Sequence, residues 1–120
     1  IGFIKKEMFI WGDETEYFLR TKKNGFSIGT IVKSVHYHPK AKGKTVNIIP
    51  FISRYKVLIK PKNFSGIYYR NLGYIFHTHY GIFSRLLLFI KYTGYFLSRL
   101  KLGAYQKFIT AYINGSRNKF

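Results

Sequence analysis

The feature that most constrains the fold of this chain is its distribution of charge. No Asp or Glu occurs between residues 17 and 120, whereas 21 Lys and Arg are spread along the sequence and give a formal net charge of +17. Such a surface repels itself unless an anionic partner neutralises it. The candidate partners are nucleic acid, anionic lipid headgroups and phosphorylated substrates.

The composition favours a folded chain without disulfides. Hydrophobic residues make up 47% and aromatic residues 20% of the sequence, which is enough for a core. The 120 residues suit one small domain or a piece of a larger one. The absence of cysteine excludes disulfides and zinc–thiolate sites. Because the chain begins at Ile1 and shows no signal-peptide pattern, we expect a fragment that lacks its N-terminal part.

Three of the four acidic residues stand in one short window, "WGDETEYFLR" (residues 11–20). Asp13 and Glu16 form an Asp-x-x-Glu pattern, which is typical of the capping box at a helix N-terminus and contributes roughly 1 kcal/mol. The helix is predicted to end at the Asn-Gly pair of residues 24–25. Glu14 has no comparable structural duty beyond complementing the helix dipole, so it is the better candidate for a chemical role.

Downstream of this acidic window, three segments differ in amino-acid composition. Residues 26–37 are rich in β-branched and aromatic residues and predict two short strands, or one strand with a bulge. Residues 46–63 are interrupted by two prolines and favour no single structure. Residues 64–120 are aromatic, aliphatic and basic, and predict helices that lie on an anionic membrane surface or pack on the main domain. Their longest strongly apolar run, residues 86–90, is too short to span a bilayer.

The stretch "FIWGDETEYFLRTKKNGFSIGTIVKSVHYHP" (residues 9–39) resembles the C-terminal half of the catalytic domain of GT-A-fold, family-2 glycosyltransferases, especially rhamnosyltransferase-like and galactofuranosyltransferase-like members. Their pattern is an aromatic-rich strand, a Trp, an acidic pair, x-Glu-Tyr-x-Leu-Arg, a basic helix end closing on Gly, and a strand ending in His. A weaker similarity continues through "YYRN" (residues 68–71) and the final "AYINGSRNKF". The matching positions in the main stretch are Phe9, Trp11, Asp13, Glu14, Glu16, Tyr17, Leu19, Arg20, Gly25 and His38.

The resemblance implies an α/β fold. Residues 1–63 would form the C-terminal part of a Rossmann-like GT-A catalytic domain, and residues 64–120 an amphipathic helical extension. Enzymes of this family move a sugar from a nucleotide-diphosphate donor to an acceptor hydroxyl with inversion. The expected acceptor is a glycan or a lipid-linked molecule in polysaccharide or cell-wall synthesis, at the cytoplasmic face of the plasma membrane. The family's Asp-x-Asp motif cannot occur in a chain with a single aspartate, so we expect these residues alone to be inactive.

Five residues are candidates for the site. By the resemblance, Glu14 is the general base that takes the proton of the acceptor hydroxyl, and Asp13 orients the acceptor or shares that role. His38 maps to the histidine of a metal site, with Mn²⁺ or Mg²⁺ as the expected cofactor. Trp11 would stack on an acceptor sugar or belong to the core. Arg20 would contact a phosphate or pair with the glutamate four residues earlier.

Two other classes of protein fit parts of the sequence. An RNA-binding module would explain the basic residues interleaved with Tyr and Phe. However, no RNP1-type run or KH-type Gly-x-x-Gly loop occurs, and an acidic window is unfavourable on an RNA-binding face, so we expect no nucleic-acid partner. A cationic membrane-surface protein without enzymatic activity is the other class, and residues 64–120 alone would support it.

Overall fold

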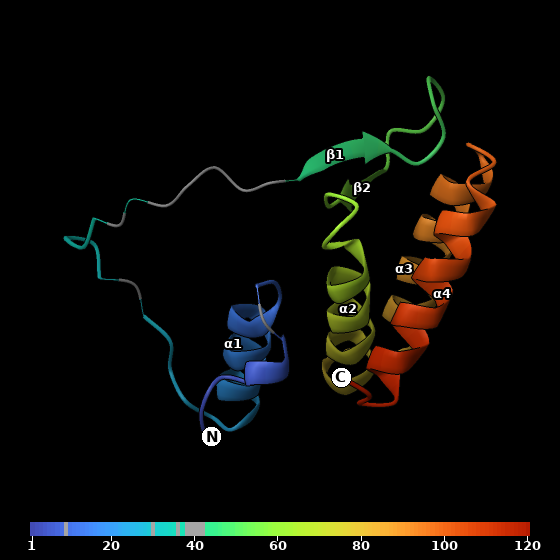
Figure 1. Ribbon diagram of the computed structural model, residues 1–120. Coiled ribbons are helices and arrows are strands. Elements are labelled where there is room, and N and C mark those ends of the chain that lie inside the picture. The colour runs from blue at the N-terminus through green and yellow to red at the C-terminus, as the bar shows by residue number, and fades with distance from the viewer. Residues whose placement is uncertain (9, 30, 36, 38–42) are drawn as a thin grey trace.

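The computed structural model describes residues 1–8, 10–29, 31–35, 37 and 43–120 (Figure 1). A short 3-10 helix, η1, opens the chain and is followed by four α-helices and two strands in these residues. In chain order the elements are η1 (Lys6–Met8), α1 (Asp13–Lys23), β1 (Lys44–Asn47), β2 (Lys56–Ile59), α2 (Ser65–His79), α3 (Ile82–Leu97) and α4 (Leu102–Ser116).

The predicted α/β class is wrong, because the described part of the chain is mainly helical. Helices hold 54% of it, and its strands form one two-stranded antiparallel sheet. In that sheet Lys44 lies opposite Ile59, and Asn47 lies opposite Lys56. A Rossmann-like domain requires several parallel strands joined by helical crossovers, and one antiparallel pair cannot supply that framework. The expected C-terminal part of a GT-A domain is therefore not what residues 1–63 form here.

The strands predicted within residues 26–37 are missing from the part of that segment that the structure describes. Its backbone there is irregular, and the side chains of Val32 and Tyr37 are each 93% exposed. A strand needs a neighbour to satisfy its backbone N–H and C=O groups. The described strands β1 and β2 pair with each other instead, so the β-rich composition of this segment does not become a sheet.

The hydrophobic core lies where β2 packs against α2, α3 and α4. Phe108 is fully buried, with its ring centroid 5.2 Å from that of Tyr69 in an edge-on contact and 5.1 Å from that of Tyr92 in a stacked one. The Tyr92 hydroxyl donates a hydrogen bond to the carbonyl of Leu58 at 2.9 Å, which ties α3 to β2. The segment predicted as an extension therefore contains most of the core. The other buried residues of the core are Val57 of β2 and Tyr95 and Phe96 of α3.

Two glycines let α2 and α4 pack with their backbones in contact. A Cβ added to Gly73 would overlap the carbonyl oxygen of Tyr112, and a Cβ added to Gly115 would overlap the carbonyl oxygen of Arg70. Figure 1 shows the two helices running alongside each other. Because the opposing atoms belong to backbone, a larger residue at either position would force the helices apart.

Side chains of α2 hold the N-terminal segment through its main chain. The buried Asn71 donates hydrogen bonds from Nδ2 to the carbonyls of Met8 and Trp11. Arg70 donates from Nη2 to the carbonyl of Glu7 at 2.7 Å. These bonds place the start of α1 against the middle of α2.

Arginines of α3 and its C-terminal connection also bind main-chain carbonyls. Arg99 donates to the carbonyls of Asn47 at 2.7 Å and Ile48 at 2.6 Å, and Arg85 donates to the carbonyl of Phe76 at 3.1 Å. Since residues 17–120 contain no carboxylate side chain, carbonyl oxygens are the acceptors that the fold offers to these guanidinium groups. The bonds join α3 to the end of β1 and to the end of α2.

Candidate functional site

The acidic window lies at the N-terminal end of α1. Gly12 is the N-cap, with a φ of 95°, and Asp13 is the first helical residue; no side chain caps this helix among the described residues. The predicted capping box is therefore wrong. Packing explains the difference, because a Cβ at position 12 would lie only 2.9 Å from Cδ1 of Ile75. Glycine meets both requirements of this position, a left-handed φ and close contact with α2.

Glu16 is buried between α1 and α2, with 1% of its surface exposed. Arg20 donates from Nε to its Oε1 at 3.0 Å and from Nη2 to its Oε2 at 3.1 Å. His79 of α2 places Nε2 at 3.6 Å from Oε1. Burial lowers the pKa of His79 below 6.5, since desolvation outweighs the opposing effect of Glu16, and Lys23 and Arg20 lower it further. This carboxylate is thus committed to joining two helices.

Asp13 and Glu14 have different surroundings. Glu14 is exposed and Asp13 is half-buried, and neither forms a salt bridge with a residue that the structure describes. Both lie in the first turn of α1, where the helix dipole favours negative charge. Among the described residues, the exposed Glu14 and the half-buried Asp13 have no salt-bridge partner and are available to a ligand, whereas Glu16 is not.

Trp11, predicted to stack on a sugar or to belong to the core, packs against the connection between β2 and α2. Its ring meets Phe64 edge-on, with centroids 5.4 Å apart at 82°. The Nζ of the buried Lys60 lies 4.4 Å from the indole centroid, which is a cation–π contact. The indole is half-buried. These contacts give Trp11 a packing role, and its contact with an acceptor sugar stays a prediction.

Arg20 uses its guanidinium within the chain. Besides the pair with Glu16, it donates hydrogen bonds to the carbonyls of Ile1 and Phe3, the latter at 2.9 Å. Of the two predicted roles for Arg20, the structure contains the ion pair with Glu16 within the same helix. A phosphate contact by Arg20 stays a prediction.

The expected metal site is not made by the described residues. His38, the predicted ligand, lies outside them. Within them, no three His, Asp or Glu side chains come together in a group that could hold a metal ion. Asp13 and Glu14 supply carboxylate oxygens, but a divalent cation takes about six ligands.

Sequence reasoning missed Asn71 and Lys60, which organise the surroundings of the window. Asn71 stands at helical spacing from Tyr68 and Ile75, on the face of α2 that turns inward. A polar side chain on an apolar helix face is the available signal that it binds backbone groups. Lys60 gives no comparable signal, because basic residues are frequent throughout the chain.

Comparisons of the chain with protein-family models, curated proteins and solved structures give no match.

Proposed function

We propose that the protein is part of an inverting, family-2-type glycosyltransferase in which Glu14 is the general base. The proposal is carried by the division of the acidic window: Glu16 is buried in an ion pair, whereas Glu14 is exposed and free of salt bridges to the described residues. It is also supported by the order of residue types that the window shares with that family. The expected substrates are a nucleotide-diphosphate sugar and a glycan or lipid-linked acceptor.

The chemistry requires a base because an alcohol is a weak nucleophile. In the proposed step, Glu14 takes the hydroxyl proton as the acceptor oxygen bonds to the anomeric carbon. The bond from that carbon to the diphosphate breaks at the same time, and the nucleotide diphosphate leaves with the electron pair. Asp13, one residue earlier, accepts a hydrogen bond from the acceptor and orients it. The Asp-x-Asp motif with which that family holds the donor does not occur in these 120 residues, since the chain has one aspartate.

The test replaces each carboxylate by its amide in the complete natural polypeptide and measures sugar transfer. Glu14→Gln should lower kcat by at least about 100-fold, because an amide cannot take the proton. Asp13→Asn should have a smaller effect, since an amide oxygen still accepts a hydrogen bond. Glu7→Gln is the matched control: Glu7 is an exposed carboxylate outside the window, and its replacement should leave kcat unchanged. Undiminished transfer by both window variants would rule the assignment out.

A second candidate function, binding to an anionic membrane surface, is favoured by the outer face of α3. Its apolar residues recur every three to four positions and remain exposed, including Phe83 at 85% and Ile90 at 64%. Lys91 flanks this face, as expected for a helix that lies in the lipid interface, whereas Arg85 turns towards the end of α2 and donates to the carbonyl of Phe76. No helix in the described part of the chain combines the length and apolar character needed to cross a bilayer. We propose a peripheral location at the cytoplasmic face of the membrane, where anionic headgroups would offset the charge of +17.

A further inference from the structure

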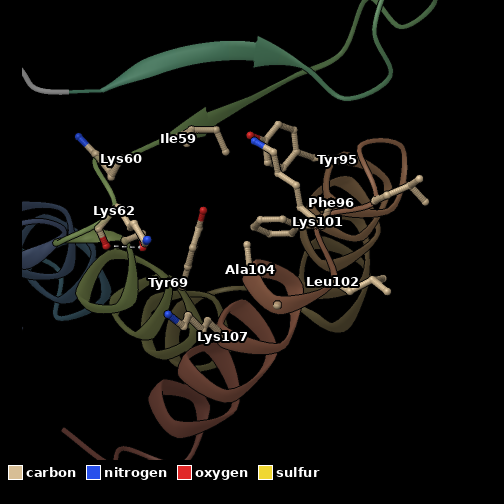
Figure 2. A pocket seen from close by; sticks show the side chains of 13 residues that line it. Ile59, Lys60, Lys62, Tyr69, Tyr95, Phe96, Lys101, Leu102, Ala104 and Lys107 are labelled. Carbon is tan, nitrogen blue, oxygen red and sulfur yellow. Dashed lines mark hydrogen bonds between the residues drawn. The ribbon is translucent and has the colours of Figure 1, made fainter.

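A cavity of about 670 Å³ opens where β2, α2 and the connection from α3 to α4 meet (Figure 2). Its walls combine aromatic rings, such as those of Tyr69 and Phe96, with the lysines at positions 62, 101 and 107. None of Trp11, Asp13, Glu14 or Arg20 lines it. The cavity is therefore separate from the acidic window, and its function does not depend on glycosyl transfer.

Tyr69 places an unpartnered polar group inside this cavity. The residue is 4% exposed, and Figure 2 shows its hydroxyl pointing into the space between the lysines. That hydroxyl makes no hydrogen bond to any residue in the described part of the chain. Burial, followed by the nearby Tyr95 and Tyr68, raises the pKa of Tyr69 above its usual range, so the group remains a neutral donor. Among the described residues this hydroxyl faces the cavity without a protein acceptor, so it is free to donate to a group that enters the cavity (Figure 2).

The first turn of α4 lines the same cavity. Its backbone N–H groups at positions 102 to 104 face no capping side chain among the described residues. Gly103 has no Cβ, and one added there would meet nothing within 4 Å, so the backbone is open on this side. Uncapped N–H groups and the positive end of the helix dipole favour an anion at this place.

Three lysines supply the positive charge. Lys62 precedes α2, Lys101 precedes α4 and Lys107 lies in the second turn of α4, and all three are exposed. They form no salt bridge with a described residue, and the nearest carboxylate in sequence is Glu16. Lys60 also lines the cavity, but its Nζ is stacked on Trp11. The Nζ of Lys101 lies 5.8 Å from the centroid of the Tyr95 ring, whereas Lys62 and Lys107 make no cation–π contact among the described residues. The three ammonium groups lie around the Tyr69 hydroxyl and the start of α4 (Figure 2).

We propose that this cavity binds a phosphate or diphosphate ester, with the phosphate at the start of α4 and an apolar part of the ligand against Leu100 and Leu102. Lys101 and Lys107 neutralise the charge, the backbone of Gly103 and its neighbours donates to phosphate oxygens, and the Tyr69 hydroxyl donates a further hydrogen bond. An ester suits this cavity better than a free inorganic ion, because its apolar part would cover Leu100 and Leu102, which line the cavity and are 84% and 63% exposed.

The test measures binding by isothermal titration calorimetry with two probes, inorganic pyrophosphate and monomeric dihexanoyl phosphatidic acid. Lys101→Gln/Lys107→Gln should weaken both by about tenfold or more, and Tyr69→Phe by about three- to tenfold, the range for one lost hydrogen bond. The control Lys22→Gln/Lys33→Gln removes the same charge from exposed residues that do not line the cavity, and it should change binding less than about twofold. Circular dichroism verifies that each variant is folded.

The two probes separate two sources of the phosphate. Tighter binding of the lipid phosphate supports the proposal and identifies a lipid-type ester, whereas tighter binding of pyrophosphate would show that an apolar part contributes nothing and would overturn the proposed ester. Equal weakening by the cavity pair and the control pair would show only general charge attraction, and it would overturn the proposal. Failure of both probes to saturate the wild-type chain would overturn it as well. Neither result bears on Glu14, whose test measures sugar transfer.

Discussion

At the scale of single residues, His79 makes the stability of the protein depend on pH. Its folded-state pKa lies below the usual 6.5, because burial opposes the charged imidazolium, and the groups around it are Glu16, Arg20 and Lys23. The unfolded chain therefore takes up a proton first as the pH falls. We expect the free energy of unfolding to be highest above pH 6.5 and to decrease as the pH falls below that value, towards the pKa of the folded state.

Urea unfolding followed by circular dichroism across this range measures the effect. His79→Gln should flatten the decrease, because glutamine does not titrate. His77→Gln, on the same helix but exposed, should leave the decrease unchanged. The interpretation fails if the two variants show the same pH dependence as the wild type.

The role of Glu16 shows what sequence reasoning can reach at this scale. Its pair with Arg20 could be predicted, because residues four apart share a helix face. Its burial could not, because that depends on His79, which lies far along the chain and reaches Glu16 only through the docking of α1 on α2. The local Asp-x-x-Glu pattern indicated a capping box for the same reason: nothing in the window reveals that α2 requires glycine at position 12.

At the scale of the elements, the stability of the fold depends on the close crossing of α2 and α4. Gly73→Ala should lower the free energy of unfolding by about 1–3 kcal/mol, because its Cβ overlaps the backbone of Tyr112 and the helices must shift. Gly66→Ala in the same helix is the control, since a Cβ there meets nothing within 4 Å. It should raise stability by up to about 1 kcal/mol through helix propensity. Chemical denaturation measures both, and similar changes in the two variants would contradict the close packing.

The elements also differ in how far the sequence predicted them. The end of α1 is confirmed, with Asn24 as the C-cap and Gly25 at a φ of 78°, because an Asn-Gly stop is a local signal. Helices in residues 64–120 are confirmed as well. The strands expected in residues 26–37 are wrong, since strand formation depends on a partner that composition does not reveal. The pairing of β1 with β2 was not predicted, because two prolines interrupt residues 46–63 and leave no clear strand pattern there.

At the scale of the whole molecule, the positive charge was evident from the sequence, but the location of the core was not. The core forms between β2 and the three helices that follow it, and it joins Val57 of β2 with Phe108 of α4, which lies far along the sequence. Local periodicity therefore described residues 64–120 as amphipathic helices without revealing which faces pack together. The structure turns one face of α3 to the core through Tyr92 and Phe96 and leaves its apolar opposite face exposed. This combination of an exposed apolar helix face and net positive charge is the basis of the proposed membrane contact.

That contact predicts the behaviour of a surface variant. Phe83→Ser/Ile90→Ser should weaken binding to vesicles of phosphatidylserine and phosphatidylcholine by at least about tenfold, because two side chains that insert into lipid each contribute about 1.5–3 kcal/mol when fully buried. Val32→Ser/Val35→Ser is the control, since these side chains are also exposed but lie outside α3, and it should bind like the wild type. Co-sedimentation at increasing salt separates the electrostatic from the apolar contribution to binding. The electrostatic contribution falls as ionic strength rises, whereas the difference in binding between the two variants persists. Equal binding by both variants at every salt concentration would mean that α3 does not face the lipid.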